Sequence, residues 1–217
     1  MQPRSFGIGI DIGTAVAIAV VIAAVLPGRS LLAAEDFREL RQQAELVKSI
    51  AADFTQTKKM KLLKKPLVSK GRFFYSAPEA VRWEYRSPIR TVSLVKGGGV
   101  KRYSLSAEGT WRADSSSAVE GMRIVMEQIT GWLAGRFDDG TLFVASLAPG
   151  ERPVVMLSPR DKEMARFISR VEVRFSNRPG VVEAVEIFEG ESTSTLIEFS
   201  NVRLNEAVDG RLFEGVE

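Results

Sequence analysis

The sequence predicts an α+β fold in which helices gather on one face of an antiparallel sheet. Two segments carry apolar residues at steps of three and four, which is the period of a helix packed on a core. Much of the remaining chain alternates apolar and polar residues, as strands with one buried face do. Short turns join these alternating segments, and such turns connect antiparallel neighbours. This order of elements favours one layer of helices on one sheet.

The first predicted helix covers residues 36–50. Its apolar stripe repeats every three or four residues and consists of Phe37, Leu40, Ala44, Val47 and Ala51. From about Ala52 the period changes to two, so we expect the first strand to begin there.

The clearest strand lies at residues 81–86. Val81, Trp83 and Tyr85 form one large apolar face, and charged residues occupy the positions between them. Residues 71–76 alternate similarly, and residues 77–80 form the hairpin connection between the two strands. Further strands are expected at 90–96, 100–106, 141–147, 153–158, 169–176, 181–188 and 194–202.

The second predicted helix covers residues 115–136. Ser117 and Glu120 have the spacing of a capping box, in which each side chain binds the other residue's backbone N–H. An unusually broad apolar face follows, made of Val119, Met122, Val125, Met126, Ile129, Trp132 and Leu133.

The N-terminal segment, residues 1–34, has the organisation of a secretory signal peptide. Arg4 follows the α-amino group, residues 15–26 carry no polar side-chain atom, and small residues lead up to Ala34. We expect cleavage after Ala34 and export, with residues 35–217 forming a single domain.

Two alternatives for this segment are an uncleaved membrane anchor and a nucleotide phosphate loop. The apolar run is short for an anchor, which takes about 20 apolar residues. Residues 9–14 resemble the phosphate hairpin of actin-like ATPases, but the apolar run after them cannot supply its polar second strand.

The composition excludes several kinds of chemistry. The chain has 30 basic and 27 acidic residues, a net charge of +3, which gives no general attraction to nucleic acid. It has no histidine and no cysteine, which excludes zinc sites built on them, Ser-His-Asp triads and Cys-His dyads. Without a cysteine the mature chain cannot itself be acylated as a lipoprotein. We expect no catalytic residue, metal or cofactor.

Two motifs are candidate sites. Ser93 and Lys96 form an S-x-x-K pair, which in penicillin-binding enzymes supplies a nucleophile and its base at the start of a helix. Here the pair lies in a predicted strand, where positions three apart face opposite sides, so this chemistry is not expected. Five lysines lie within residues 58–65. They form either a solvated loop or a docking patch for an anionic partner or a lipid headgroup.

Large aromatic and methionine side chains give the sheet and the second helix apolar faces. These faces either close into an ordinary core or leave an apolar cavity for a lipid. The residues that would line the cavity are Phe73, Tyr75, Val81, Trp83 and Tyr85 from the sheet, and Met122, Met126, Ile129 and Trp132 from the helix.

Part of the chain resembles the outer-membrane lipoprotein carrier (LolA) family. The matching residues are FTQ at 54–56, PLVSKGRFFYSAPEAVRWEY at 66–85 and SP at 87–88. They are similar to the family's Phe-x-Gln strand, its Gly-led strand, its proline hairpin and its aromatic strand ending in Trp. The order of helices and strands is also similar across the mature chain.

The resemblance implies an open, curved antiparallel sheet, an unclosed barrel, with helices as a lid over a hydrophobic cavity. It implies a soluble, monomeric carrier in the periplasm for an acylated lipoprotein or another lipid. The donor would be an inner-membrane ABC transporter or lipid exporter, and the acceptor an outer-membrane receptor. A lipid-sensing regulatory domain of the same fold and an acyl-ester hydrolase are the alternatives.

The resemblance also assigns roles to single residues. Val81 and Trp83 would face the cavity, and Pro78 matches the hairpin proline. Ala77 stands where the family often has an arginine that contacts the lid and helps the release of cargo. Either Arg82 or a lysine would then replace that arginine, or the lid would be tuned differently.

Overall fold

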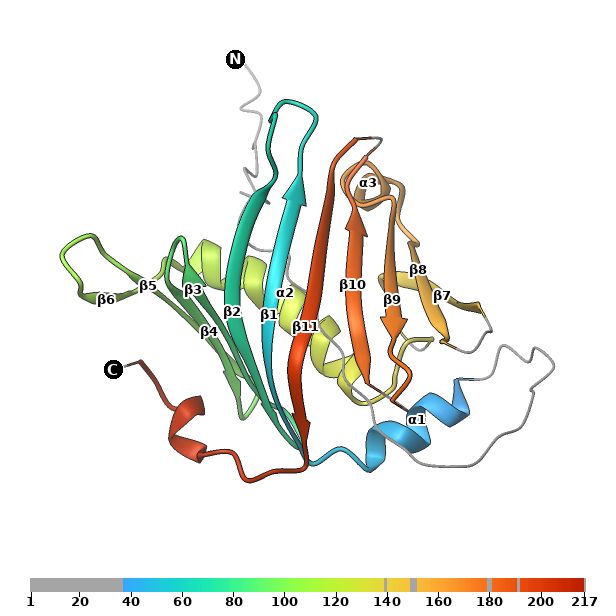
Figure 1. Cartoon of the computed structure of the whole chain (residues 1–217), viewed down its shortest axis with the longest axis horizontal. Helices are drawn as coiled ribbons and strands as arrows, with labels where there is room; N and C mark the ends of the chain where they lie inside the picture. The colour runs from blue at the N-terminus through green and yellow to red at the C-terminus, as the bar shows by residue number, and fades with distance from the viewer. Residues whose placement is uncertain (1–36, 139, 149–151, 179–180, 191, 217) are drawn as a thin grey trace, which may run out of the picture.

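The computed structural model describes residues 37–138, 140–148, 152–178, 181–190 and 192–216 (Figure 1). The predicted signal peptide at residues 1–34 lies outside the described residues. Among the described helices, none is long and apolar enough to span a membrane.

Eleven strands form one antiparallel sheet in the order β6-β5-β4-β3-β2-β1-β11-β10-β9-β8-β7 (Figure 1). The first and last strands of the chain pair at its centre, and the edge strands β6 and β7 do not pair with each other. The sheet is therefore an unclosed barrel, which confirms the predicted fold class. The strands are β1 (Ser49–Lys59), β2 (Leu67–Ser76), β3 (Ala80–Ser87), β4 (Thr91–Lys96), β5 (Gly99–Leu105), β6 (Trp111–Ala113), β7 (Phe143–Ala148), β8 (Val154–Pro159), β9 (Arg170–Phe175), β10 (Val182–Phe188) and β11 (Ser194–Leu204).

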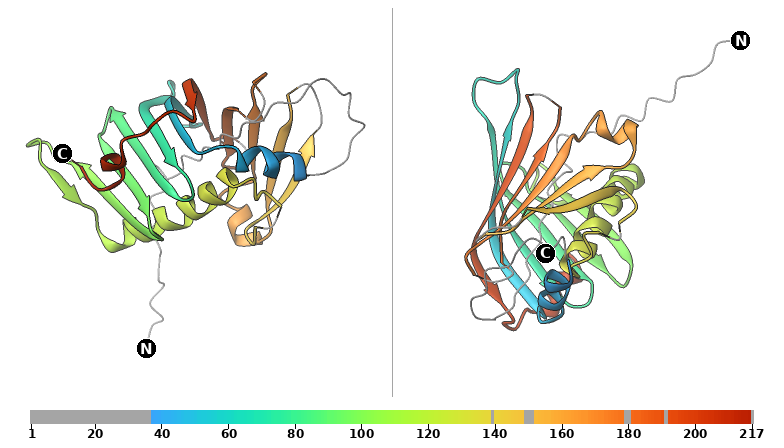
Figure 2. Two further views of the ribbon diagram at one scale, coloured as in Figure 1. Left: turned by 90° about the horizontal axis from the view of Figure 1, so that it is seen from below. Right: turned by 90° about the vertical axis from the view of Figure 1, so that its right-hand side faces the viewer.

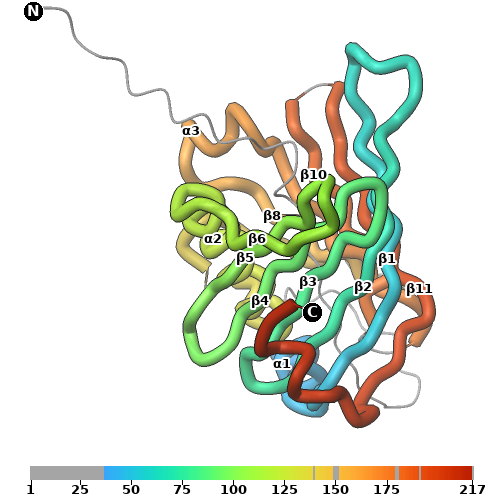
Figure 3. The backbone as a smooth tube through the Cα atoms, turned by 90° about the vertical axis from the view of Figure 1, so that its left-hand side faces the viewer, coloured from blue at the N-terminus to red at the C-terminus, as the bar shows by residue number. Residues whose placement is uncertain are grey.

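The helices cover the concave face of this sheet. Helix α2 (Ser116–Leu133) connects the two edge strands and crosses the hollow of the curved sheet, and α1 (Arg38–Glu45) lies at the lower end of that hollow (Figure 2). The short helix α3 (Lys162–Ala165) follows β8. On the opposite, convex face, the 3-10 helix η1 (Gly210–Phe213) contacts β3 and β4 (Figure 3).

Register shifts accompany the curvature of the sheet. They occur where β1 pairs with β11 near Ala51, where β2 pairs with β3 near Gly71, and where β10 pairs with β9 near Val182. Such bulges bend a strand and increase its twist. At Gly71 the chain passes directly beneath another side chain, because an added Cβ would lie 2.4 Å from Cζ of Phe54. A glycine is therefore required where β2 passes beneath this ring.

The first helix is shorter than the sequence predicts. Strand β1 begins at Ser49 and not near Ala52. Asn205, which directly follows β11, explains why the helix ends early and the strand begins at Ser49. Its Oδ1 accepts a hydrogen bond from the N–H of Lys48 at 2.7 Å, and its Nδ2 donates to the carbonyl of Leu46 at 3.1 Å. This partner is distant in sequence, so the local period could not reveal it.

The second helix is confirmed, but its predicted capping box is wrong. The N-cap is Ser115, whose side chain makes no capping hydrogen bond. Ser117 lies inside the first turn, where its backbone is already helical. Glu120 forms an ion pair with Arg123 at 2.6 Å instead.

The other predicted strands are confirmed with ends that differ by a few residues. The elements that the sequence did not predict are β6, α3 and η1, which have three or four residues each. Segments this short cannot display a period.

Candidate functional site

All nine residues predicted to line a cavity belong to one apolar core between the sheet and α2. Eight of them are at most 5% exposed, and Tyr85 is partly buried against the same core. The sheet contributes Phe73, Tyr75, Val81, Trp83 and Tyr85 from β2 and β3. The helix contributes Met122, Met126, Ile129 and Trp132. The structure thus brings the two predicted sets together, and the entry of a lipid between them stays a prediction.

On the sheet side, the aromatic rings gather around Trp83. Its ring centroid lies 4.8 Å from that of Phe54, 5.4 Å from Phe73 and 6.3 Å from Phe199. Sequence reasoning did not include Phe54 and Phe199 in the site. Both follow the period-two burial of β1 and β11, which is the signal that could have found them.

On the helix side, a second aromatic group surrounds the end of α2. The ring of Trp132 stacks on Phe137 with centroids 6.3 Å apart and planes at 13°. Phe37, before α1, and Phe175, in β9, lie 6.2 and 6.4 Å from Phe137. Phe137 lies beyond the predicted helical stripe, so sequence reasoning missed it. This group joins both helices to the sheet at one end of the hollow.

One polar contact lies within the sheet-side aromatic group. The hydroxyl of Tyr85 donates a hydrogen bond to Oε1 of Gln56 at 2.7 Å. Burial raises the pKa of Tyr85 far above its ordinary value, and the nearby Trp83 N–H and Arg102 lower it only in part. The hydroxyl therefore keeps its proton and remains a hydrogen-bond donor. The acceptor is Gln56, the third residue of the FTQ motif.

Ala77 and Pro78 lie in the exposed turn between β2 and β3. The N–H of Ala77 donates to the carbonyl of Lys48 at 2.9 Å, and the Tyr75 hydroxyl donates to the carbonyl of Pro78 at 3.2 Å. Burial raises the pKa of Tyr75, and the charge of Arg136 lowers it in part. The charge that acts on the Tyr75 hydroxyl thus comes from Arg136, which follows α2.

Arg82 does not lie at the hairpin contact, so the suggestion that it replaces the missing arginine is wrong. Its side chain is on the convex face, where Nε lies 2.9 Å from Glu84. Its Nη1 donates to the carbonyls of Leu212 at 3.0 Å and Gly215 at 2.9 Å. Arg82 therefore anchors the C-terminal segment, which sequence reasoning had no means of placing.

The lysine-rich segment forms the end of β1 and the turn to β2. Lys58 is buried, and its Nζ lies 2.8 Å from Oε2 of Glu189. The other four lysines, Lys59, Lys61, Lys64 and Lys65, are exposed. Leu62, which lies among them, is 91% exposed. The docking hypothesis therefore concerns four lysines and a neighbouring leucine at the tip of a projecting hairpin (Figure 1).

Ser93 and Lys96 lie on β4, as the sequence predicts. Ser93 is buried, whereas Lys96 is exposed and lies 3.3 Å from Glu214. Within the described residues, no group of His, Cys, Asp or Glu side chains could hold a metal ion.

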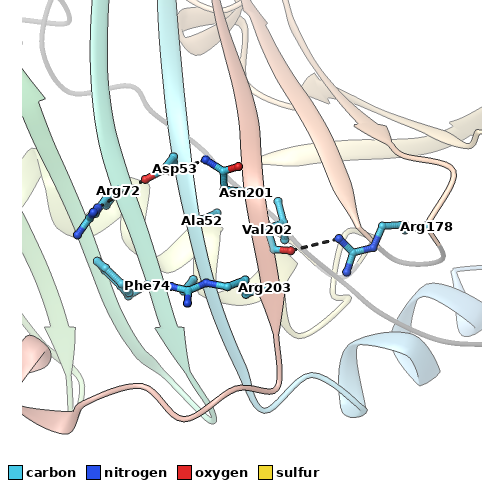
Figure 4. Close-up of a pocket in the computed structure, with 9 residues that line it drawn as sticks. Ala52, Asp53, Arg72, Phe74, Arg178, Asn201, Val202 and Arg203 are labelled. Atoms are coloured by element: carbon cyan, nitrogen blue, oxygen red, sulfur yellow. Dashed lines mark hydrogen bonds and ion pairs between the residues drawn. The ribbon is translucent and has the colours of Figure 1, made fainter.

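A separate groove of about 570 Å³ lies on the convex face (Figure 4). Asp53 is one of its lining residues and lies 3.5 Å from Nε of Arg72, and it accepts a hydrogen bond from Asn201 at 2.8 Å. Arg178 and Arg203 complete the charged lining. The sheet separates this groove from α2, so it is not the predicted cavity.

The family model for the outer membrane lipoprotein carrier protein LolA matches residues 45–215. No curated protein matches the chain. A LolA superfamily protein from Nitrosomonas europaea is similar at 10% identity, with 80% of this chain and 95% of that chain covered and a TM-score of 0.44. The MucA/MucB complex of Pseudomonas aeruginosa is similar at 12% identity, with coverage of 84% and 60% and a TM-score of 0.49.

The family model spans most of the described residues, including the aromatic strands, α2 and the C-terminal segment. The protein therefore belongs to the LolA family of outer membrane lipoprotein carrier proteins.

Proposed function

We propose that the protein is a periplasmic carrier that holds the acyl chains of a lipoprotein, or of a related lipid, between α2 and the concave face of the sheet. It moves them from the inner to the outer membrane. The observation that supports this proposal is the apolar layer in which nine side chains from two facing elements meet. Family membership supports it independently.

The physics of acyl chains suits this role. Each buried CH₂ group contributes about 0.8 kcal/mol, so a long acyl chain leaves a membrane for water far too slowly to be transported free. A carrier needs only to cover the chain, and it needs no catalytic residue. The apolar layer beneath α2 offers such a cover.

The proposed route has two partners and one compartment. An inner-membrane ABC transporter or lipid exporter would load the carrier, and an outer-membrane receptor would unload it. The carrier would act as a soluble monomer in the periplasm after cleavage near Ala34. N-terminal sequencing of the purified protein should give Glu35 or a neighbouring residue, and an intact Met1 in a membrane fraction would contradict this part of the proposal.

The tip of the β1–β2 hairpin is the proposed contact with anionic lipid headgroups. Its four exposed lysines supply positive charge, and each basic residue near an anionic membrane surface contributes about 1 kcal/mol. Leu62 is 91% exposed and Leu63 is 42% exposed, so both can enter the apolar region below the headgroups. The two kinds of side chain together fit a membrane surface.

The experiment that tests carriage is native mass spectrometry of the protein expressed with its own N-terminal segment and purified from a bacterial periplasm. We expect a bound acylated molecule on the native protein. Trp83→Glu places a charge in the apolar layer and should abolish the adduct, whereas the exposed control Glu79→Gln should retain it. Native protein without any lipid, and without binding to added fatty acid, would overturn the proposal.

A further inference from the structure

The groove on the convex face combines a low floor with long side chains on either side of it (Figure 4). Ala51 of β1 pairs with Phe74 of β2 on one side and with Arg203 of β11 on the other. Residues directly opposite one another share a face, so the short methyl group of Ala51 lies between two long neighbours. The resulting groove of about 570 Å³ is in the size range of ligand sites in proteins.

Three arginines from separate segments line this groove. Arg72 lies on β2, Arg203 on β11, and Arg178 between β9 and β10. Strands β2 and β11 flank β1, so these two strands are about 10 Å apart. Among the described residues that line the groove, Asp53 is the only carboxylate. Three positive charges and one negative charge give the lining a net charge of +2.

Arg178 has no carboxylate partner among the residues that the structure describes. Its Nη1 donates to the carbonyl of Val202 at 3.1 Å, which holds the guanidinium at the groove (Figure 4). This carbonyl directly follows Asn201, whose φ of 53° marks the bulge of β11. A guanidinium has five N–H donors, so Arg178 keeps donors for a ligand.

The other two arginines form exposed ion pairs. Arg72 lies 3.5 Å from Asp53, and Arg203 lies 3.3 Å from Glu206. The four side chains are 45–62% exposed. Exposed ion pairs contribute little to stability, so a carboxylate of a ligand can replace Asp53 or Glu206 at small cost.

We propose that this groove binds an acidic, extended segment of a protein partner, with carboxylates on the arginines and an apolar side chain on Phe74. The proposal goes beyond the carrier function and does not depend on it. Arginine and carboxylate form paired, charge-assisted hydrogen bonds. Alternate side chains of an extended segment lie on one side about 7 Å apart, so two carboxylates can reach different arginines. A phosphate would concentrate its charge beside Asp53, which repels it.

Two dye-labelled hexapeptides test the proposal. One alternates glutamate and leucine, and the other has glutamine in place of glutamate. Fluorescence anisotropy with the native protein should show at least tenfold tighter binding of the acidic peptide. Arg178→Gln should weaken this binding about tenfold, as expected for the loss of a hydrogen bond between charged groups. Arg112→Gln is the matched control, because it removes a 71% exposed arginine of β6 outside the groove, and it should change the affinity less than twofold.

Asp53→Asn should have the opposite effect. Its amide oxygen can still accept the hydrogen bond from Asn201, but the charge of Arg72 becomes available to the ligand. We expect the acidic peptide to bind about fivefold more tightly to this variant. Glu108→Gln, the control, removes a 69% exposed carboxylate outside the groove and should change the affinity less than twofold. Equal gains in the two variants would show that only net charge attracts the peptide, and would overturn the proposal.

Equal binding of the two peptides to the native protein, or unchanged binding in Arg178→Gln, would also overturn it. If Arg178→Gln instead loses binding to phosphatidylglycerol vesicles and keeps the peptide, the groove is a membrane contact and the proposal is wrong.

The lipid adduct seen by native mass spectrometry should persist in Arg178→Gln and Asp53→Asn, because the sheet separates the groove from α2. An adduct without peptide binding would overturn this proposal alone. Peptide binding without an adduct would overturn only the carrier function.

Discussion

At the scale of single residues, Gly71 allows the sheet-side aromatic rings to close over the strand. A Cβ at this position would lie 2.0 Å from the carbonyl oxygen of Glu84 and 2.4 Å from the Phe54 ring. We expect Gly71→Ala to lower the free energy of unfolding by about 3 kcal/mol, because neither the backbone nor the packed ring can yield.

Gly121 in α2 is the matched control for this change. An added Cβ would meet no atom within 4 Å there. Gly121→Ala should raise the free energy of unfolding by up to about 1 kcal/mol through helix propensity. Thermal or denaturant unfolding of the two variants measures both effects, and equal effects at the two positions would contradict the clash at Gly71.

Arg82 and Arg86 lie near the same carboxylate but in different environments. The side chain of Arg82 is 10% exposed and also binds two backbone carbonyls of the C-terminal segment, whereas that of Arg86 is 52% exposed and 3.8 Å from Glu84. We expect Arg82→Ala to lower the free energy of unfolding by about 2–3 kcal/mol, because it leaves Glu84 and the carbonyls without their donor.

Arg86→Ala should change the free energy of unfolding by less than about 0.5 kcal/mol, as exposed ion pairs do. Amide exchange should also become faster across residues 210–215 in Arg82→Ala and stay unchanged in Arg86→Ala. The pattern of alternation alone assigns both arginines to an exposed face. Equal losses of unfolding free energy in the two variants would show that the contact of Arg82 with the C-terminal segment does not stabilise the fold.

At the scale of elements, the two halves of α2 differ in burial. The first half has a single buried side chain, Met122, whereas the second half has Met126, Ile129, Trp132 and Leu133. Each such side chain contributes about 1.5–3 kcal/mol when it is buried. We expect amide hydrogens of residues 120–124 to exchange faster than those of residues 128–133, so that α2 opens first beside β5. Uniform exchange along α2 would indicate that the helix opens as one unit.

The β1–β2 hairpin is the second element with a testable role. The double variant Leu62→Glu/Leu63→Glu should lower binding to vesicles that contain anionic phospholipid by at least tenfold, since it removes the apolar contact and adds negative charge. Leu46→Glu is the control, because this side chain is 55% exposed and precedes β1, at the other end of the strand. Vesicle co-sedimentation measures both, and a native protein that does not sediment with anionic vesicles rules out the contact.

At the scale of the whole molecule, loading and release of a lipid by the proposed carrier would require the concave face to open. Complete removal of α2 would expose its five buried side chains at a cost of about 10 kcal/mol. The open state is therefore rare unless a partner or cargo stabilises it. The turn at residues 77–79, between Tyr75 and the aromatic strand β3, is one place where this balance can be set.

Ala77→Arg tests that role of the turn. The side chain at this position is exposed, so we expect the melting temperature to stay the same. The arginine adds a long side chain with five N–H donors to this turn, so the rate of lipid transfer to acceptor vesicles should change. Glu79→Gln is the control, because it alters net charge by the same amount within the same turn. Equal transfer rates for Ala77→Arg and the native protein would show that this position does not influence the opening of the concave face.

Apart from the short elements β6, α3 and η1, the order of helices and strands, and the face that each presents to the core, were determined by the sequence itself. The period of apolar residues is a local property, so the alternation at residues 81–86 and the stripe of α2 could be predicted together with the nine side chains that meet. Only the tertiary structure decided where α1 ends and how Arg82 is used. Asn205 and the carbonyls of residues 212 and 215 are long-range partners that no local pattern encodes. The physical reason is that a period reports which side of an element is buried, whereas contacts between distant segments depend on how the whole chain folds.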